Sequence, residues 1–388
     1  MAADLKIFAN NVEESAMEII NSVATHPYFT DKKIRIMPDT HAGAGIVIGF
    51  TCPMGEYVNP EHIGVDIGCG IEIEMFDKVL SSEDYPLFEQ RIRNAIPMGF
   101  NLNEKSKIDL KEFCRFVRRE LYSAEQASAG LVHEVPFSSE SDIADWCKSV
   151  NIDTGVFYKS LGTLGGGNHF IELDYNEEMN LMGATVHTGS RNLGVKVCAK
   201  WKKKCVDDYL SGEDLEGYLT DMVICQAYAK YNRKIILEQI ADIYKKLCKG
   251  RVVANISSIH NYLDFEDGII RKGAIRSYKY CGLVIPFNMR DGIAICEGKS
   301  NEDWNCSAPH GAGRILSRSK AKEQVSMESF QESMKGIYST SICPETLDES
   351  PMAYKDTEEI IKLIEPTCEI KYMMKPVINI KDTGRKKN

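Results

Sequence analysis

The chain has 388 residues, of which 43% are hydrophobic and 27% charged, as in soluble globular proteins. Its net charge of −9 argues against a general nucleic-acid coat protein, which binds mainly by neutralising phosphates, but it allows a local basic site. No apolar run approaches the roughly 20 residues of a membrane helix. The first ten residues lack a signal-peptide pattern, and thirteen irregularly spaced cysteines favour free thiols. We therefore expect a cytoplasmic protein without a membrane partner.

Helical periodicity appears first in residues 12–23. Runs of strand length or strand alternation follow at residues 33–37, 45–51, 70–76, 170–173, 184–187, 252–256, 269–277, 282–286 and 293–296. Residues 84–150 and 195–248 are mainly helical in pattern, the second long enough for two or three helices. A further helix is predicted to begin near His310 and run past Lys322, and residues 369–381 predict a strand pair.

Helices and strands therefore mix without strict alternation, which predicts an α+β fold with mixed sheets flanked by helices. Because no segment has the composition of a linker, we expect one domain over residues 1–388. Residues 382–388 are expected to form a flexible basic tail.

Histidines in loops beside strand-like runs are the first candidates for chemistry. Four of the eight histidines have glycine- or serine-rich neighbours: His169 in GGGNHF, His187 in VHTGS, His260 in SSIHN and His310 in SAPHGAGR. A single buried histidine is more often a hydrogen-bonded core residue, but four in such contexts favour a shared site, because rigid scaffolds present functional groups in loops at strand ends. His41, in MPDTHAG, is intermediate. The remaining histidines are expected to be surface or structural residues: His26, His62 and His133.

A second candidate is the segment GVDIGCG at residues 64–70. Its glycines allow a tight turn that would bring Asp66 and Cys69 to one ion, although a buried cysteine at a strand entry is the plainer alternative. Carboxylate, thiolate and imidazole together suit Mn²⁺, Zn²⁺ or Fe²⁺, and a bridging thiolate would allow two ions.

Basic residues follow the same histidine motifs: Arg191 after His187, Arg271, Lys272 and Arg276 after His260, and Arg314, Arg318, Lys320 and Lys322 after His310. A solvated basic face is common, but this repeated placement favours phosphate binding. The chain has no P-loop and no KxDG motif, so a nucleotide carried covalently would need another nucleophile, such as an imidazole.

Six motifs occur in the order seen in RtcB-type RNA ligases: GVDIGCG, GTLGGGNHFIE, HTGSRNLG, the His260–Asn261 pair, RKGAIRS and HGAGRILSR. MPDTHAG at residues 37–43 and PMAYKD at 351–356 also match, so the chain resembles this family over nearly its whole length. The resemblance implies the family's own α+β fold with the active site in a cleft.

The resemblance also implies a metal site and a nucleophile. Cys69 would bridge two Mn²⁺ ions, Asp66 and His169 would complete one metal shell, and His187 and His260 the other. His310 would attack the α-phosphorus of GTP and hold GMP as a phosphoramidate, with Asp39 in a supporting role. The substrates would be an RNA ending in a 2′,3′-cyclic phosphate or 3′-phosphate and an RNA with a 5′-hydroxyl. An archease-like activator could assist as a partner protein.

Two further sets of residues follow from the same resemblance. The guanylate contacts would be Asn168, Phe170, Glu172, Asn261, Asn288, Ala312, Gly313, Tyr354 and Lys381. The RNA phosphate contacts would be Arg191, Lys272, Arg314 and Arg318. The chain departs from the family pattern in the loop IPFNMRDGI at residues 285–293, where Asn288 and Ile293 replace hydroxyl residues. We therefore expect a preference for GTP that is weaker than the family norm.

Two other functions compete with this interpretation. A metal-dependent phosphoesterase could open cyclic phosphates with the same metals and would not need His310. A non-catalytic RNA-binding homologue is disfavoured, because every residue type of the metal site and the nucleophile is present.

Overall fold

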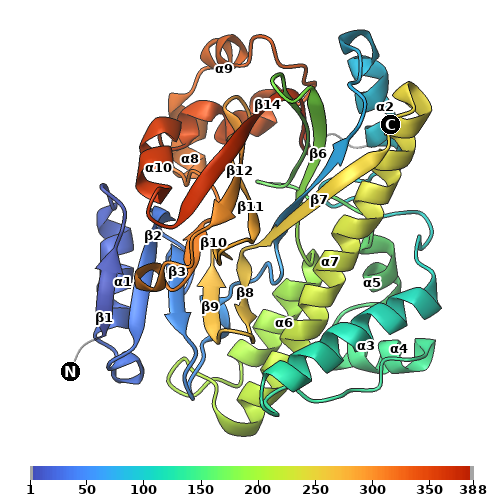
Figure 1. The fold of residues 1–388 in the computed structure, drawn as a ribbon. Helices are drawn as coiled ribbons and strands as arrows, with labels where there is room; N and C mark the ends of the chain where they lie inside the picture. Colours follow the sequence, from blue (N-terminus) through green and yellow to red (C-terminus); the bar gives the residue numbers. More distant parts are fainter. Residues whose placement is uncertain (1–2, 385–388) are drawn as a thin grey trace.

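In the computed structural model, residues 3–384 are described, and the strands lie between two groups of helices (Figure 1). Helices α3 to α7 gather on one side, whereas α8 to α10 cover the other (Figure 1). The helices are α1 Glu14–Ala24, α2 Tyr85–Ala95, α3 Leu110–Ala127, α4 Glu140–Ser149, α5 Thr154–Ser160, α6 Asn192–Lys202, α7 Gly212–Cys248, α8 Arg318–Gln324, α9 Met327–Ser333 and α10 Thr357–Ile364.

The larger sheet is antiparallel and has the strand order β11-β12-β14-β5-β6-β4-β7. Its strands are β4 Gly70–Phe76, β5 Phe170–Asn176, β6 Leu181–Thr188, β7 Val252–Ile259, β11 Gly282–Asn288, β12 Gly292–Gly298 and β14 Cys368–Ile380. A second sheet has the order β1-β2-β3-β9-β8 and is parallel only between β1 and β2. Its strands are β1 Asp4–Ile7, β2 Lys33–His41, β3 Ile48–Pro53, β8 Asn261–Asp264 and β9 Ile269–Lys272, and β10 Ala274–Arg276 pairs separately with β13 Ser307–Pro309.

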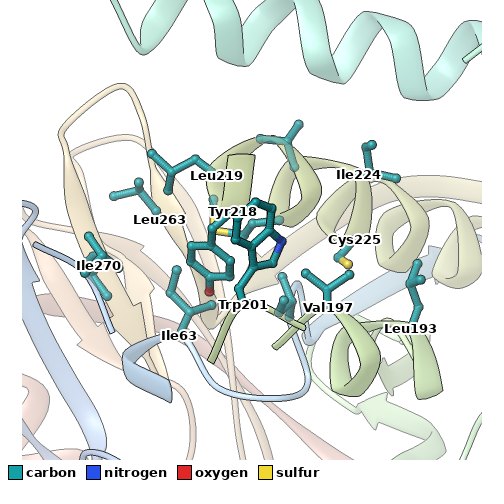
Figure 2. Close-up of a cluster of buried hydrophobic side chains, with 14 of the residues drawn as sticks. Ile63, Leu193, Val197, Trp201, Tyr218, Leu219, Ile224, Cys225, Leu263 and Ile270 are labelled. Atoms are coloured by element: carbon teal, nitrogen blue, oxygen red, sulfur yellow. The ribbon is translucent and has the colours of Figure 1, made fainter. Parts of the chain in front are cut away.

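Helix α7 forms the centre of the largest apolar core. Trp201 of α6 and Tyr218 of α7 pack there with Leu263 of β8 and Ile270 of β9 (Figure 2). Most of α7 between Leu215 and Tyr244 is buried, because α3, α6 and the sheets cover different faces of the helix. Apolar burial of this extent is the main stabilising contribution to such a fold. No helix of the described residues is both long and apolar enough to cross a membrane.

The structure confirms the α+β class with sheets flanked by helices, although only the five-stranded sheet is mixed and the larger sheet is antiparallel. The strand at Gly70–Phe76 is confirmed with the predicted bounds, and residues 195–248 contain parts of α6 and α7. Residues 385–388 of the predicted tail lie outside the described residues.

Two predictions about the C-terminal third are wrong. No helix begins at His310, because β13 ends at Pro309 and α8 begins only at Arg318. Gly313 has φ +76°, and a Cβ atom there would lie 2.1 Å from the Asp39 carbonyl oxygen, so the chain passes too close to β2 to coil. The expected strand pair is one long strand, β14, because the register shift beside Pro376 is a bulge rather than a turn.

Candidate metal centre and nucleotide pocket

Four strands of the larger sheet bring the histidine motifs together. Cys69 directly precedes β4, His169 directly precedes β5, His187 lies at the end of β6, and His260 follows β7. The register places these ends side by side, because Gly70 pairs with the end of β6 and of β7 on either side. Antiparallel pairing of four neighbouring strands therefore gathers side chains that are up to 191 positions apart in the sequence, from Cys69 to His260.

The ligand atoms lie close together in this cluster. The Cys69 Sγ atom lies 3.3 Å from His187 Nε2 and 3.5 Å from His169 Nε2. The Nε2 atoms of His187 and His260 are 3.3 Å apart, and Asp66 Oδ2 lies 2.9 Å from His169 Nε2. All five residues that we predicted as metal ligands therefore meet at one place.

Hydrogen bonds at Nδ1 fix the tautomers of His169 and His187. His169 Nδ1 lies 3.0 Å from the Leu164 carbonyl oxygen and His187 Nδ1 lies 3.2 Å from that of Asn168. Since a carbonyl only accepts, each Nδ1 donates, and the Nε2 lone pair of a neutral ring points into the cluster, as in histidines that bind metals. Burial lowers the pKa of His187 and of His260 well below the ordinary value, so both rings are neutral.

Imidazole nitrogens, a thiol and a carboxylate that converge in this way are the donors that transition-metal ions prefer, so the residues present fit a metal site. Cys69, His169 and His187 are the group with the closest ligand atoms, all within 4.8 Å of one another. Burial, followed by the nearby Asp66 charge, raises the pKa of the Cys69 thiol, whereas a coordinated cation would hold it as the thiolate. Burial would raise the pKa of Asp66, but the His169 ring beside its carboxylate holds it at about 2, so this ligand is charged.

Two buried residues of α7 support the metal loops and were missed by sequence reasoning. Arg233 Nη1 donates to the carbonyl oxygens of Gly68 and Thr188, each at 2.9 Å. Asn232 Oδ1 accepts from the backbone N–H of Gly162 at 2.7 Å. Gly68 and Thr188 adjoin the predicted ligands Cys69 and His187, and Gly162 lies in the loop that leads to His169. The signal in the sequence was a polar pair inside an otherwise apolar helical segment, which is costly to bury without partners.

A cavity of about 280 Å³ opens beside the metal cluster. Its lining includes every residue that we predicted to contact the nucleotide: Asn168, Phe170, Glu172, Asn261, Asn288, Ala312, Gly313, Tyr354 and Lys381. His310 also lines it, as does His41, the histidine of intermediate context. The cavity wall further contains Asn379 and Met289, which we did not predict as site residues.

His310 is held by a buried carboxylate. Its Nδ1 atom lies 2.6 Å from Asp39 Oδ2, and its backbone N–H donates to the same oxygen at 3.2 Å. Because the Asp39 carboxylate can only accept, Nδ1 carries the proton and the lone pair of a neutral ring is on Nε2. The His310 ring lies 4.6 Å from that of His260, so it borders the metal cluster.

A cationic group surrounds Glu349, at the end of the 3₁₀ helix η5 (Pro344–Glu349). Its carboxylate lies 3.1 Å from Lys381 Nζ, 3.3 Å from Arg314 Nη1 and 3.4 Å from Arg318 Nη1, and it accepts from the Tyr354 hydroxyl at 2.8 Å. Burial would raise the pKa of Glu349, but these cations hold it at about 2. Glu349 was not predicted, although it organises four residues that line the cavity.

Two predicted phosphate contacts are not brought to the cavity. Lys272 Nζ donates to the carbonyl oxygens of Ala44, Ile46 and Glu61, and burial lowers its pKa to about 8. Arg191 donates from Nη2 to the Gly99 carbonyl oxygen at 2.7 Å. Both side chains therefore hold loops together, whereas Arg314 and Arg318 line the cavity.

The other histidines fit their prediction, since His62 is buried in the core and His133 is exposed.

The fold and site define an α+β protein with a buried cluster of cysteine and histidine side chains that could hold a metal ion, beside a cavity of about 280 Å³. A family model described as tRNA-splicing ligase RtcB matches residues 19–382, so the chain belongs to the RtcB family. It is 28% identical to the RNA-splicing ligase RtcB of Escherichia coli (strain K12) over 95% of both chains. It is also 25% identical to the tRNA-splicing ligase RtcB of Archaeoglobus fulgidus, over 91% of this chain and 88% of the relative, and 25% identical to the RNA-splicing ligase RtcB of Mycobacterium bovis.

Proposed function

We propose that the protein is an RNA ligase that uses GTP and Mn²⁺ to join an RNA 2′,3′-cyclic phosphate or 3′-phosphate end to a 5′-hydroxyl end. Membership of the RtcB family supports the RNA ligase class. The observation that carries the finer proposal is the contact between His310 and buried Asp39, which leaves the His310 Nε2 lone pair free in the cavity beside the metal cluster.

In the proposed first step, His310 Nε2 attacks the α-phosphorus of GTP, an N–P bond forms, and the bond to pyrophosphate breaks. Asp39 accepts the Nδ1 proton in a hydrogen bond and so stabilises the positive charge that develops on the ring. Asp66, Cys69, His169, His187 and His260 would hold two manganese ions, which when bound neutralise phosphate charge.

In the next steps, any cyclic phosphate is first opened by water to a 3′-phosphate. An oxygen of this 3′-phosphate attacks the phosphorus of the His310 adduct, and the N–P bond breaks. The RNA 5′-hydroxyl then attacks the activated 3′-phosphate, and GMP leaves with the bonding electrons. Activation is needed because a phosphate monoester is a poor electrophile until it carries a good leaving group.

The residues that line the cavity support a nucleotide-binding wall and a neighbouring pair of RNA phosphate contacts. Lys381 Nζ lies over the Phe170 ring, 5.5 Å from its centroid, and Tyr354 and Lys381 share Glu349, so one wall combines a ring face with cations. Arg314 and Arg318 lie at this wall, and Arg318 is half exposed. Paired arginines of this kind bind phosphate oxygens well, so we propose them as RNA phosphate contacts.

A ligation assay tests the proposal. The protein is incubated with Mn²⁺, GTP and two synthetic RNAs, one ending in a 2′,3′-cyclic phosphate and one beginning with a labelled 5′-hydroxyl nucleotide. We expect a joined product that requires both GTP and Mn²⁺. Opening of the cyclic phosphate without any joined product would instead identify a phosphoesterase.

Replacing Asp39 with asparagine should slow formation of the His310 adduct by on the order of a hundredfold, because the nucleophile loses the charge that orients its ring. Single-turnover labelling with GTP measures this rate, and metal content and GTP affinity should stay near the wild-type values. The matched control is Asp303→Asn, which removes an exposed carboxylate paired with Lys6. A normal rate in Asp39→Asn would show that the contact is not functional.

GTP should be preferred over ATP, but with weaker discrimination than in the family. Asn288 lines the cavity, yet its side chain bonds the Asp291 carboxylate and the backbone N–H of Arg290, and Ile293 is buried in an apolar cluster. A lost hydrogen bond to the nucleotide typically costs about 0.5–1.5 kcal/mol, or roughly two- to tenfold in affinity. Competition of ATP against labelled GTP measures the preference, and a clear preference for ATP would refute it.

A further inference from the structure

Phe100 is the most exposed large apolar side chain in the part of the chain that the structure describes, with a relative exposure of 104%. It lies in the loop between α2 and α3. Single exposed apolar side chains are common on protein surfaces and need no explanation by themselves. Phe100 differs from these because the loop that carries it is bonded to a wall of the active site.

A tight turn at residues 98–101 presents the Phe100 ring. The Asn101 backbone N–H and the Asn101 side-chain amide both donate to the Met98 carbonyl oxygen, at 3.1 and 3.0 Å. Gly99, at the first central position of the turn, has φ +63°, which glycine adopts without strain. The backbone below the ring is therefore ordered before any ligand binds, which lowers the entropy lost on binding.

This turn is held against the glycine-rich loop at residues 162–169. Gly99 donates its backbone N–H to the Gly165 carbonyl oxygen at 2.8 Å, and its own carbonyl oxygen accepts from Arg191 Nη2 at 2.7 Å. The contact is close, because a side chain at Gly165 would overlap the Arg191 guanidinium group. The turn and the glycine-rich loop are thus packed as one unit.

Consecutive glycines of this loop connect the turn with the cavity. A Cβ atom on Gly166 would lie 3.6 Å from the Gly99 Cα atom, and one on Gly167 would lie 3.2 Å from Arg318 Nη2. Arg318 is half exposed and lines the cavity. Because the Cα atoms of neighbouring residues are about 3.8 Å apart, Phe100 and Arg318 lie within reach of one short RNA segment.

The chemistry beside Phe100 suits an unpaired base better than a phosphate group. The Asp382 carboxylate lies against the turn, since a Cβ atom on Gly99 would be 2.5 Å from its Oδ2 atom. Its negative charge disfavours a phosphate next to Phe100, whereas the Arg318 guanidinium group attracts one. A neutral base stacks on an aromatic ring whatever its identity. A single-stranded RNA end can therefore place a phosphate on Arg318 and a base on Phe100.

We propose that Phe100 is an RNA-binding residue whose ring stacks on an unpaired base next to the end to be joined. This inference rests on the proposed function, because it assumes that RNA ends reach the cavity. The contact selects no particular sequence, since every base has a face that can stack. Phe100 therefore raises the affinity for RNA and takes no part in the transfer of GMP to His310.

RNA affinity is the first test, measured by fluorescence anisotropy of a short labelled single-stranded RNA with a 3′-phosphate, in the presence of Mn²⁺. Phe100→Ala should raise the Kd by on the order of tenfold. Phe100→Leu should bind as weakly as the alanine variant, because it keeps an apolar side chain without a ring. Phe100→Trp should bind at least as well as the wild type. All three variants should be labelled by GTP at the wild-type rate.

Tyr122→Ala is the matched control, because Tyr122 is another exposed aromatic residue, 58% accessible, but lies on α3. It should bind RNA like the wild type. Loss of affinity in this variant equal to that in Phe100→Ala would overturn the inference, because the effect would then belong to exposed aromatic residues in general.

The Phe100→Trp protein also reports stacking directly. The three native tryptophans are buried, so a tryptophan at position 100 is the exposed one, and a stacked base should quench its fluorescence. RNAs with an abasic nucleotide near the 3′-phosphate or near the 5′-hydroxyl identify the strand. The abasic site that abolishes quenching should weaken binding to the wild type but not to Phe100→Ala.

Equal RNA affinity of the wild type and Phe100→Ala would overturn the inference, and so would wild-type affinity in Phe100→Leu or an unquenched tryptophan at position 100. Slow GTP labelling of Phe100→Ala would also overturn it, because the ring would then support the site rather than the RNA. If the wild type binds no RNA end and forms no joined product, the proposed function fails instead. The two failures are therefore distinguishable.

Discussion

Replacing His310 with alanine is expected to abolish covalent labelling of the protein by GTP while leaving its manganese content unchanged. His310 borders the metal cluster through the His260 ring but is held by Asp39, outside the set of metal ligands. An RNA that already carries a 3′-guanylate should still be joined by this variant, because that step needs no histidine nucleophile. Labelling with GTP, metal analysis and ligation of the activated RNA measure the three effects.

His133→Ala is the matched control, because this histidine is exposed and its ring pairs with Glu216 at the surface. It should label like the wild type. Covalent label on the His310→Ala protein, or loss of its manganese, would contradict the separation of nucleophile and metal site. Loss of joining with the activated RNA would show that His310 acts in the last step as well.

Replacing Cys69 with alanine is expected to remove manganese and, with it, both labelling and joining. The Cys69 Sγ atom lies within 3.5 Å of two imidazole nitrogens, so the substitution removes the ligand atom that lies between them. Changes to residues that merely support metal ligands cost about 10- to 100-fold in metal affinity, and loss of a shared ligand should cost at least as much. Equilibrium dialysis against Mn²⁺ and the GTP labelling assay measure the effects.

Cys225→Ala is the control, because Cys225 is another fully buried thiol that lies in the core of α7 (Figure 2). It should retain manganese and activity, with at most a small loss of stability. Normal manganese content and full labelling in Cys69→Ala would refute a centre built on this thiolate.

The convergence of the five predicted ligand residues could be predicted from the sequence, because its signals are local. Each ligand motif adjoins a strand-like run, and these runs are neighbours in one sheet, so the loops at their ends meet. The supporting residues could not be predicted in this way. Arg233 and Glu349 acquire their roles from partners far away in the sequence, and no motif marks them.

Local sequence patterns differ from the structure in two places, the position of Lys272 and the helix expected after His310. Lys272 follows a histidine motif, but its ammonium group donates hydrogen bonds to three backbone carbonyls. A basic residue close to a site motif in the sequence therefore need not face the site. The periodic pattern after His310 indicated a helix, but the close approach of Gly313 to β2 prevents a helix from forming before Arg318. Arg314 and Arg318 nevertheless converge, because both pair with Glu349.

The central claim is that His310 is the nucleophile that carries GMP. The most direct measurement is incubation of the wild-type protein with Mn²⁺ and GTP labelled at the α-phosphate, followed by denaturation and mass spectrometry of the peptides. We predict that GMP is attached to His310, through an acid-labile and alkali-stable bond, with release of one pyrophosphate per label. Label on any other residue, or no label on protein that has bound manganese, would contradict the claim.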